Sequence, residues 1–468
     1  MIKSYNIFLN VSLLTILSFL FVIISPGANK SLIWMCLIIF YLTFFYSLRK
    51  TIRIVPEIKT FIKIDTFFLF FYYLIYFFPY QLYVLGLKSL EHPKLLTYLE
   101  YTNKSIILST IGLLAFQIGF NYYKSEYQKP VLFLVSKRYM RMTSFIILFF
   151  ITLILLLFYN TGAQTIFIGA YAGSKMGTVT YDAIFSLVSY FIILGIICGI
   201  IHYKIFKKGT IQIYIIYVIS ALWMLALLFI GDRNTFFLIG IVAFSGFFTF
   251  IKSISRKRIL FYLIISLFLY QIIEISRAEE DKSLETFVDA FTTTIDSFEG
   301  DLDYSNSFDI TTTGLRSSLK IIDEKNYYFG KFKLISLASI IPYSSRLIVD
   351  NDEIFTGTSS VLKEEMIGLR RNWGVGTNII SDCFLDFGLL GVIIILFYFG
   401  KFGGYLQFQT QNNINSPKWI FLYIICLSYY SEMARYGFDF PLRSIVWTYF
   451  LFFTINKVMK MNPKSLTI

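Results

Sequence analysis

Long runs of apolar residues constrain this chain more than any other feature. Each run has about 18 to 22 residues and few charges, which suits a helix crossing a hydrocarbon core of about 30 Å. The chain of 468 residues is 56% hydrophobic and only 15% charged, whereas globular proteins have about 25% charged residues. A soluble fold cannot hide this much apolar surface. The sequence therefore predicts a protein that is embedded in a membrane.

We expect an all-α polytopic integral membrane protein with about 12 transmembrane helices. The predicted spans are residues 7–25, 31–48, 64–85, 104–123, 142–159, 181–203, 210–230, 235–251, 259–275, 379–400, 418–433 and 443–456. The first run lacks a small-residue cleavage site and is expected to remain as an uncleaved helix. The chain then divides into helices 1–9 (1–275), a large outer loop (276–378) and helices 10–12 (379–468).

Basic residues in the connections predict the orientation of these spans. Lys and Arg number 23 in one set of alternate connections and termini, and 8 in the opposite set. Since cytoplasmic connections carry the excess of Lys and Arg, both termini are expected in the cytoplasm. The net charge of +13 then reflects topology, and no nucleic-acid partner is expected. Residues 276–378 are therefore expected to form a large, partly helical loop on the outer (periplasmic) face.

Three segments of this outer loop have helical or apolar character. Apolar residues recur at helical spacing from Leu284 to Phe298, which predicts an amphipathic helix lying along the membrane interface. The apolar stretch from Phe332 to Tyr343 is too short to span and is expected to dip into the membrane or pack on the protein. Residues from Val361 to Arg371 are expected to form another short helix. With 17 acidic and 11 basic residues, the loop has a mixed-charge surface.

Cofactor motifs are missing from the sequence. The four Cys residues have no metal-ligand spacing, and His92 and His202 have no partner at such spacing. No glycine-rich phosphate loop occurs, and the predicted cytoplasmic connections are too short for a nucleotide-binding domain. We therefore expect no metal or other cofactor. Any activated substrate must bring its own leaving group.

Ionisable residues cluster near the predicted outer ends of spans 7 to 12, where charges are costly unless they are paired, solvated or bound to a ligand. They are Asp232, Arg233, Glu274, Arg277, Glu279, Glu280, Asp382, Asp386, Glu432, Arg435, Asp439 and Arg443. Guanidinium groups bind phosphate oxygens bidentately and can stabilise the charge on a departing pyrophosphate. A lipid pyrophosphate is therefore the expected ligand. The alternative is that these arginines snorkel or pair with neighbouring carboxylates.

Asp382 and Asp386 lie four residues apart and share one face at the start of the predicted tenth span. A partly buried carboxylate at this position has the chemistry to accept a proton from a sugar hydroxyl. The alternative is that both residues are acidic only because carboxylates are favourable near a helix N-terminus.

Several motifs of the chain resemble those of the Wzy-type O-antigen and capsular repeat-unit polymerases. The turn Gly231-Asp232-Arg233 follows an apolar helix, and the loop carries Gly330 followed by Ile341-Pro342. Beyond the loop, Gly374-Val375-Gly376-Thr377 leads to Phe387-Gly388-Leu389-Leu390-Gly391. Arg435 lies in the following outer turn, and Arg346 is separated from Gly357 by ten residues, as in some members of that family. The topology also resembles that family along the whole chain.

This resemblance implies a membrane glycosyltransferase in the bacterial inner membrane that needs neither a metal nor a nucleotide sugar. It would transfer the growing glycan from undecaprenyl pyrophosphate to an incoming repeat unit that is linked to the same lipid. A Wzz-type chain-length regulator is the implied protein partner. The residues implied to hold pyrophosphate are Arg233, Arg277, Arg346, Arg435 and Arg443. Asp382, Asp386 or Glu280 would assist deprotonation of the acceptor hydroxyl.

Three other functions compete with this interpretation. An O-antigen ligase shares the large loop but usually employs a loop histidine, and residues 276–378 contain none. A flippase for lipid-linked oligosaccharides has a similar number of spans but lacks so long an external loop. This chain also shows no internal repeat of the kind found in many transporters. A partner protein whose loop binds a chain-length regulator without catalysis is the third possibility.

Overall fold

The computed structural model of the chain describes twelve continuous segments. They are residues 2–50, 52–55, 58–60, 62–92, 94–123, 179–206, 211–230, 232–255, 307–341, 357–368, 374–413 and 416–460, with short pieces between 146 and 153, between 257 and 292, and at 344. Most of the predicted span 142–159, part of the predicted span 259–275 and most of the helix expected at Leu284–Phe298 fall outside these residues.

The described elements are helices apart from one small hairpin. In chain order they are α1 (Ile2–Ile23), α2 (Lys30–Arg49), β1 (Ile52–Val55), β2 (Ile58–Thr60), α3 (Ile64–Tyr76), α4 (Phe78–Val84), η1 (Leu99–Tyr101), α5 (Thr102–Phe120), α8 (Val179–Phe206), α9 (Ile211–Ile230), α10 (Arg233–Phe250), α13 (Ser307–Glu324), α14 (Lys331–Ala338), α15 (Thr358–Ile367), α16 (Ile379–Asn412), α17 (Pro417–Met433) and α18 (Asp439–Lys460). The antiparallel β1–β2 hairpin, which pairs Ile52 with Thr60, lies in a connection where the sequence suggested no strands.

Membrane-spanning length is reached by four of the described helical segments. They are Lys30–Arg49, Leu99–Phe120, Leu187–Lys204 and Ile379–Asn412, and each combines sufficient length with an apolar composition. A fifth span is formed if α3 and α4 cross the membrane together, because they are bent by 48° at the break between them. Shorter apolar helices at Phe8–Ile23, Ile213–Leu228 and Asn234–Phe250 coincide with further predicted spans. A helical membrane protein is thus supported, and the total of twelve spans stays a prediction.

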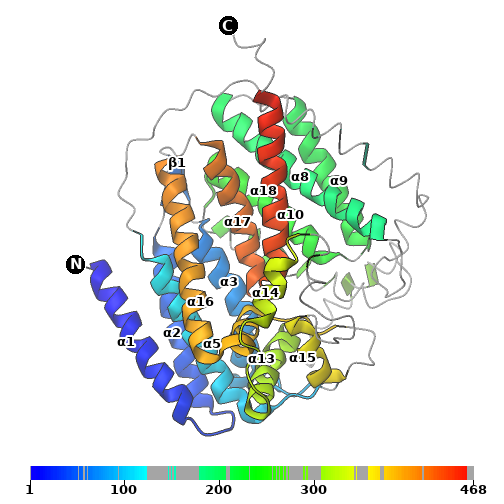
Figure 1. The fold of residues 1–468 in the computed structure, drawn as a ribbon. Helices are drawn as coiled ribbons and strands as arrows, with labels where there is room; N and C mark the ends of the chain where they lie inside the picture. The colour runs from blue at the N-terminus through cyan, green and yellow to red at the C-terminus, as the bar shows by residue number, and fades with distance from the viewer. Residues whose placement is uncertain are drawn as a thin grey trace.

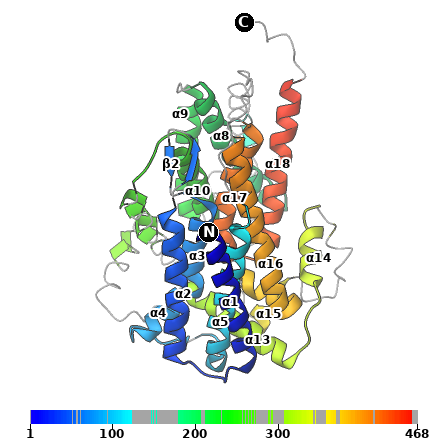
Figure 2. The same cartoon turned by 90° about the vertical axis from the view of Figure 1, so that its left-hand side faces the viewer.

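The long helices run roughly side by side and form one bundle (Figure 1). Nearly every residue of α5 is buried, and this helix packs against α1, α2, α3, α13 and α16. Helices α8, α9 and α10 pack on one another, and α10 also contacts α17. Helices α13, α14 and α15 lie towards one end of the bundle, whereas the β1–β2 hairpin and the C-terminal end of α18 lie towards the other (Figures 1 and 2).

Glycine allows α5 and α16 to approach each other at backbone distance. A Cβ atom on Gly119 would overlap the carbonyl oxygen of Phe397, and one on Gly400 would overlap the carbonyl oxygen of Phe116. Small residues that let helix backbones touch are typical of membrane interfaces, where packing replaces the hydrophobic effect as the driving force. This crossing fixes α16, whose first turns carry the polar site.

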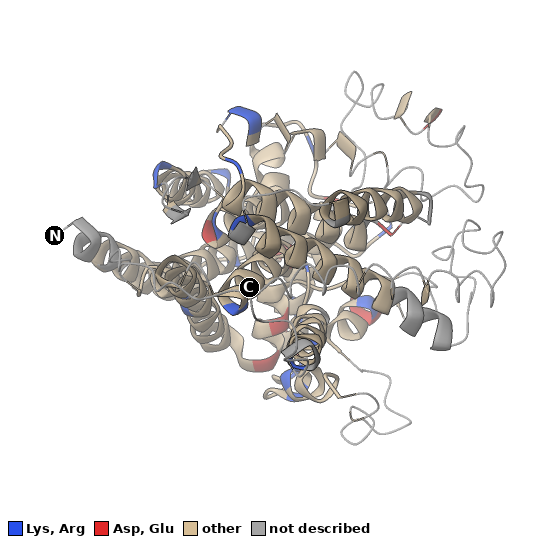
Figure 3. Ribbon diagram, turned by 90° about the horizontal axis from the view of Figure 1, so that it is seen from above, with Lys and Arg blue, Asp and Glu red and all other residues tan. Residues whose placement is uncertain are grey.

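Large apolar side chains cover much of the outer surface of the bundle. Phe8 and Phe19 on α1 are 70% and 72% exposed, and Leu390 on α16 is 68% exposed. Most of the ribbon seen along the bundle is uncharged (Figure 3). A soluble protein would not expose such continuous apolar faces, whereas lipid tails cover them without cost.

The described part of the segment predicted as the outer loop is folded into helices that pack together. Part of α13 packs with α14 and α15 around a small core that includes Ile321, Phe332, Leu362, Met366 and Leu385. The short helix expected at Val361–Arg371 is observed as α15, and the apolar stretch from Phe332 lies largely in α14. Helix α13 was not predicted. It is amphipathic and packs against α3, α4 and α5.

Candidate functional site

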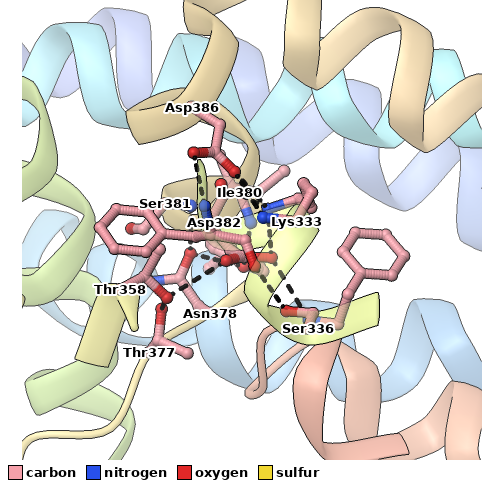
Figure 4. Close-up of polar contacts among 12 residues, drawn as sticks. Lys333, Ser336, Thr358, Thr377, Asn378, Ile380, Ser381, Asp382 and Asp386 are labelled. Carbon is pink, nitrogen blue, oxygen red and sulfur yellow. Dashed lines mark hydrogen bonds and ion pairs between the residues drawn. The ribbon is translucent and has the colours of Figure 1, made fainter. Parts of the chain in front are cut away.

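Asp382 and Asp386 both face Lys333, a residue that the sequence did not single out (Figure 4). The Nζ atom of Lys333 lies 2.6 Å from Oδ2 of Asp382 and 3.2 Å from Oδ2 of Asp386. The exposed fractions of these side chains are 17%, 3% and 0% respectively. Two carboxylates and one ammonium group therefore form a buried ion cluster between α14 and α16.

The carboxylate of Asp386 binds the N-terminus of α14. Its Oδ1 atom accepts a hydrogen bond from the backbone N–H of Phe332 (3.3 Å), and its Oδ2 atom accepts one from the N–H of Lys333 (3.2 Å). A carboxylate is favourable at a helix N-terminus because the free N–H groups and the helix dipole both attract it. The preceding residue, Gly330, has φ of +85°, and a Cβ atom there would lie 2.6 Å from the ring of Phe387. Glycine thus lets α14 start directly against α16.

Asp382 connects α16 to two further segments. Its Oδ1 atom accepts a hydrogen bond from the hydroxyl of Thr358 (3.2 Å), the first residue of α15. Its Oδ2 atom accepts one from the backbone N–H of Phe438 (3.3 Å), which directly precedes α18. Lys333 Nζ also donates to the carbonyl oxygen of Asp382 at 2.8 Å. Four segments of the chain therefore meet at one carboxylate.

Every carboxylate oxygen in this cluster accepts at least one hydrogen bond from the protein. Burial opposes the charge on Lys333, but the negative charges of Asp382 and Asp386 outweigh it and raise the pKa of this lysine. The ammonium group is therefore firmly charged at neutral pH. The geometry favours a role in holding α14, α15, α16 and α18 together, and the predicted role of either Asp as a base stays a prediction.

Asn378 supports the cluster from the start of α16. Its Oδ1 atom accepts hydrogen bonds from the backbone N–H of Ser381 (2.8 Å) and from the hydroxyl of Tyr76 (2.9 Å). Its Nδ2 atom donates to the carbonyl oxygen of Thr311 on α13 at 3.2 Å. Asparagine is a favoured N-cap residue, and here it also connects α3 and α13 to α16. The acidic face of α16 is thereby fixed relative to the bundle.

The backbone conformation at Gly388 shows why the run Phe387-Gly388-Leu389-Leu390-Gly391 has a glycine at this position. Its φ of +63° and ψ of −152° break the helical path of α16 just after Asp386. A Cβ atom at Gly388 would lie 2.9 Å from the ring of Tyr327. A conformation of this kind is readily adopted only by glycine. The kink therefore separates the short segment that carries the ion cluster from the long apolar part of α16.

A groove of about 250 Å³ lies on another side of the same bundle. Its walls come from α3, α9, α10, α13, α17 and from residues between 259 and 269, and most of the lining residues are aromatic or aliphatic. Four polar residues, Asn234, Ser431, Glu432 and Arg435, gather where α10 begins and α17 ends, while Tyr262 and Ser266 lie on the wall. The groove thus combines a long apolar wall with a polar end.

The remaining predicted site residues are placed as follows. Arg233 is the first residue of α10, and the side chain of Arg233 lies outside the described part of the chain. Asp232 caps this helix, because its carboxylate accepts a hydrogen bond from the backbone N–H of Thr235 at 3.2 Å. Arg443 is exposed on α18. Arg277, Glu280 and Arg346 lie outside the described residues. The structure therefore brings Asp382 and Asp386 together and places Arg435 separately, at the polar end of the groove.

Sequence reasoning missed two residues that the structure places at these sites. Lys333 lies within the apolar stretch that starts at Phe332, and the occurrence of a single lysine in that stretch was the one sequence feature that could have drawn attention to it. Glu432 was counted among the outer ionisable residues but was given no role. Within the described part of the chain, no three His, Cys, Asp or Glu residues are grouped closely enough to hold a metal ion.

The fold and these two features define a helical, multi-pass membrane protein with a buried ion cluster and an apolar groove that ends in polar groups. Residues 5–462 match the sequence model of the family described as "O-antigen polysaccharide polymerase Wzy". The chain belongs to this family, as its motifs had suggested. No curated protein and no solved structure matches the chain.

Proposed function

We propose that the chain polymerises lipid-linked oligosaccharide repeat units of an O-antigen or capsule at the outer face of the inner membrane. It transfers the growing glycan from undecaprenyl pyrophosphate to an incoming repeat unit on the same lipid, without a metal or a nucleotide sugar. Membership of the polymerase family supports the reaction type. The observation that carries the proposal is the groove, because its apolar wall and polar end match the two halves of a lipid pyrophosphate.

The lipid chain would lie along the aromatic wall formed by α3 and α10, and its pyrophosphate would lie at the polar end. Binding pockets are typically apolar, with a few polar groups that orient the ligand. Arg435 lines that end of the groove, and its guanidinium can bind phosphate oxygens bidentately. Arg233 is the first residue of α10 and directly precedes Asn234, which lines the groove. Arg277, Arg346 and Arg443 complete the proposed set of pyrophosphate ligands.

Catalysis would come mainly from stabilising the leaving group. As the glycan leaves the lipid, the electron pair of the broken bond departs on the pyrophosphate, and fixed positive charges lower the energy of that state. Removing a single donor of this kind typically costs about 10²- to 10³-fold in rate. An arginine at the polar end therefore contributes to turnover as well as to binding.

The orientation of the protein is part of the proposal. The β1–β2 hairpin, which lies in a basic connection, and the C-terminal end of α18 lie towards the end of the bundle opposite α13, α14 and α15 (Figure 1). This arrangement supports cytoplasmic termini and an outer-face position for the loop helices. A Wzz-type chain-length regulator is the proposed protein partner, and the outer loop is the part of the chain that it would reach.

Alanine substitution of the arginines tests this proposal in cells. Variants R233A, R277A and R435A are expected to reach the membrane at wild-type levels but to leave a single repeat unit on the acceptor instead of a long polymer. R435K should restore little activity, because a lysine ammonium cannot form the bidentate contact. Long surface polymer in all three alanine variants would contradict the pyrophosphate assignment.

A further inference from the structure

We propose that Glu432 is the carboxylate that accepts the proton of the acceptor hydroxyl during polymerisation. The inference rests on the proposed function and assigns a chemical step to the groove. Glu432 lies near the end of α17, is 8% exposed and lines the groove together with Arg435. Within the described part of the chain, it is the carboxylate among the groove-lining residues.

Three other described carboxylates near this end of the bundle have structural partners that the hydrogen bonds identify. Each carboxylate oxygen of Asp382 and Asp386 accepts a hydrogen bond from the protein. Asp232 accepts hydrogen bonds from the backbone and hydroxyl of Thr235 and so caps α10. None of these three residues lines the groove. Glu432 differs from these three residues in that its side chain lines the groove where the lipid substrate is proposed to bind.

Glu432 and Arg435 are held together by the backbone at the end of α17. The N–H of Arg435 donates a hydrogen bond to the carbonyl oxygen of Glu432 at 2.9 Å. Ala434 lies between these two residues, and its carbonyl oxygen accepts a hydrogen bond from the hydroxyl of Tyr76 at 3.0 Å. Tyr76 is fully buried and also contacts Asn378. An acidic and a basic group thus reach the groove from a turn that α3 and α16 hold in place.

These two groups supply complementary parts of a glycosyl transfer. A bond forms between the acceptor oxygen and the anomeric carbon of the growing glycan, while the bond from that carbon to the pyrophosphate oxygen breaks. The bonding electron pair leaves with the lipid pyrophosphate beside Arg435, and the hydroxyl proton passes to the Glu432 carboxylate. General base assistance of this kind contributes about 10²- to 10⁴-fold in rate.

The test uses purified full-length protein in lipid nanodiscs, with lipid-linked repeat units as substrate. E432Q keeps the size of the side chain but cannot accept the proton, so the elongation rate should fall at least about 100-fold. The KM for the lipid-linked substrate and the melting temperature should stay close to wild type. E324Q is the matched control, because Glu324 is an exposed carboxylate at the end of α13, and it should elongate at the wild-type rate.

Elongation by E432Q within about threefold of wild type would overturn the inference while leaving the polymerase assignment intact. If wild-type protein does not elongate the substrate at all, the proposed function fails first. Should E432Q be unstable, the comparison of wild type with E432D carries the test. A shift in the acidic limb of the pH–rate profile of E432D supports the inference, and an unchanged limb contradicts it.

Discussion

Replacing Lys333 with Met tests whether the ion cluster holds α14 on the bundle. Methionine retains most of the length and apolar character of the lysine stem but removes the ammonium group. Asp382 and Asp386, which are 3% and 0% exposed, would then remain buried without their counter-ion. Three hydrogen-bond acceptors around Nζ, at 2.6, 2.8 and 3.2 Å, would lose their donor.

The expected cost follows from this burial. Removing one partner of a buried ion pair typically destabilises a protein by about 3 to 5 kcal/mol, because an uncompensated charge remains. The backbone N–H groups of Phe332 and Phe438 and the hydroxyl of Thr358 still donate to the two carboxylates. We therefore expect a loss of about 3 kcal/mol, at the lower end of that range.

The unfolding free energy is measured by denaturant titration in detergent micelles, with Lys325→Met as the matched control. Lys325 is exposed in the turn after α13, and surface substitutions of this type usually change stability by less than about 0.5 kcal/mol. The variant K333M/D386N should recover part of the loss, because it removes one of the unpaired charges. If K333M is as stable as K325M, the cluster does not fasten α14 to α16 and the reasoning is refuted.

Three further outcomes follow from the structure. Between pH 7 and 9 the stability difference between wild type and K333M should not decrease. The raised pKa of Lys333 means that its contribution is lost only as the pH rises beyond the ordinary value of 10.5, so a difference that has faded by pH 9 contradicts this. Gly400→Leu should sharply reduce the yield of folded protein in size-exclusion chromatography, because any side chain at this position overlaps the backbone of α5. Gly374→Ala is the control and should behave like wild type, because the added Cβ atom meets no other atom within 4 Å. Gly240→Phe should narrow the groove and raise the KM for lipid-linked substrate in elongation assays, and an unchanged KM would remove the groove from the substrate path.

Much of the bundle was predictable because lipid imposes a simple rule on sequence. A helix satisfies its own backbone hydrogen bonds, so apolar runs of sufficient length become helices, and predicted spans such as 31–48 and 104–123 agree with α2 and α5. The bend between α3 and α4 was missed because hydropathy treats 64–85 as one run and does not register the break at Phe77. Helix α13 was missed because its apolar positions alternate with Thr, Ser and charged residues in a loop of mixed charge.

The candidate site was only partly predictable, because its geometry depends on contacts between distant parts of the chain. The spacing of Asp382 and Asp386 correctly placed both on one face of a helix, but no local signal paired them with Lys333, about 50 residues earlier. The glycine and phenylalanine pattern around Gly388 identified the family, while its physical reason, a kink packed on Tyr327, required the structure. Arg435 and Glu432 were both in the predicted outer set, and of the members whose side chains are described these two line the groove.

Elongation by the purified protein tests the central claim most directly. Full-length chain in lipid nanodiscs is mixed with lipid-linked repeat units alone, with no metal ion and no nucleotide sugar added, and the products are separated by size. The polymerase assignment predicts a ladder of products that differ by one repeat unit, together with release of one lipid pyrophosphate for each unit added. A substrate that a known polymerase elongates under the same conditions, but that this protein leaves as single repeat units, would contradict the assignment.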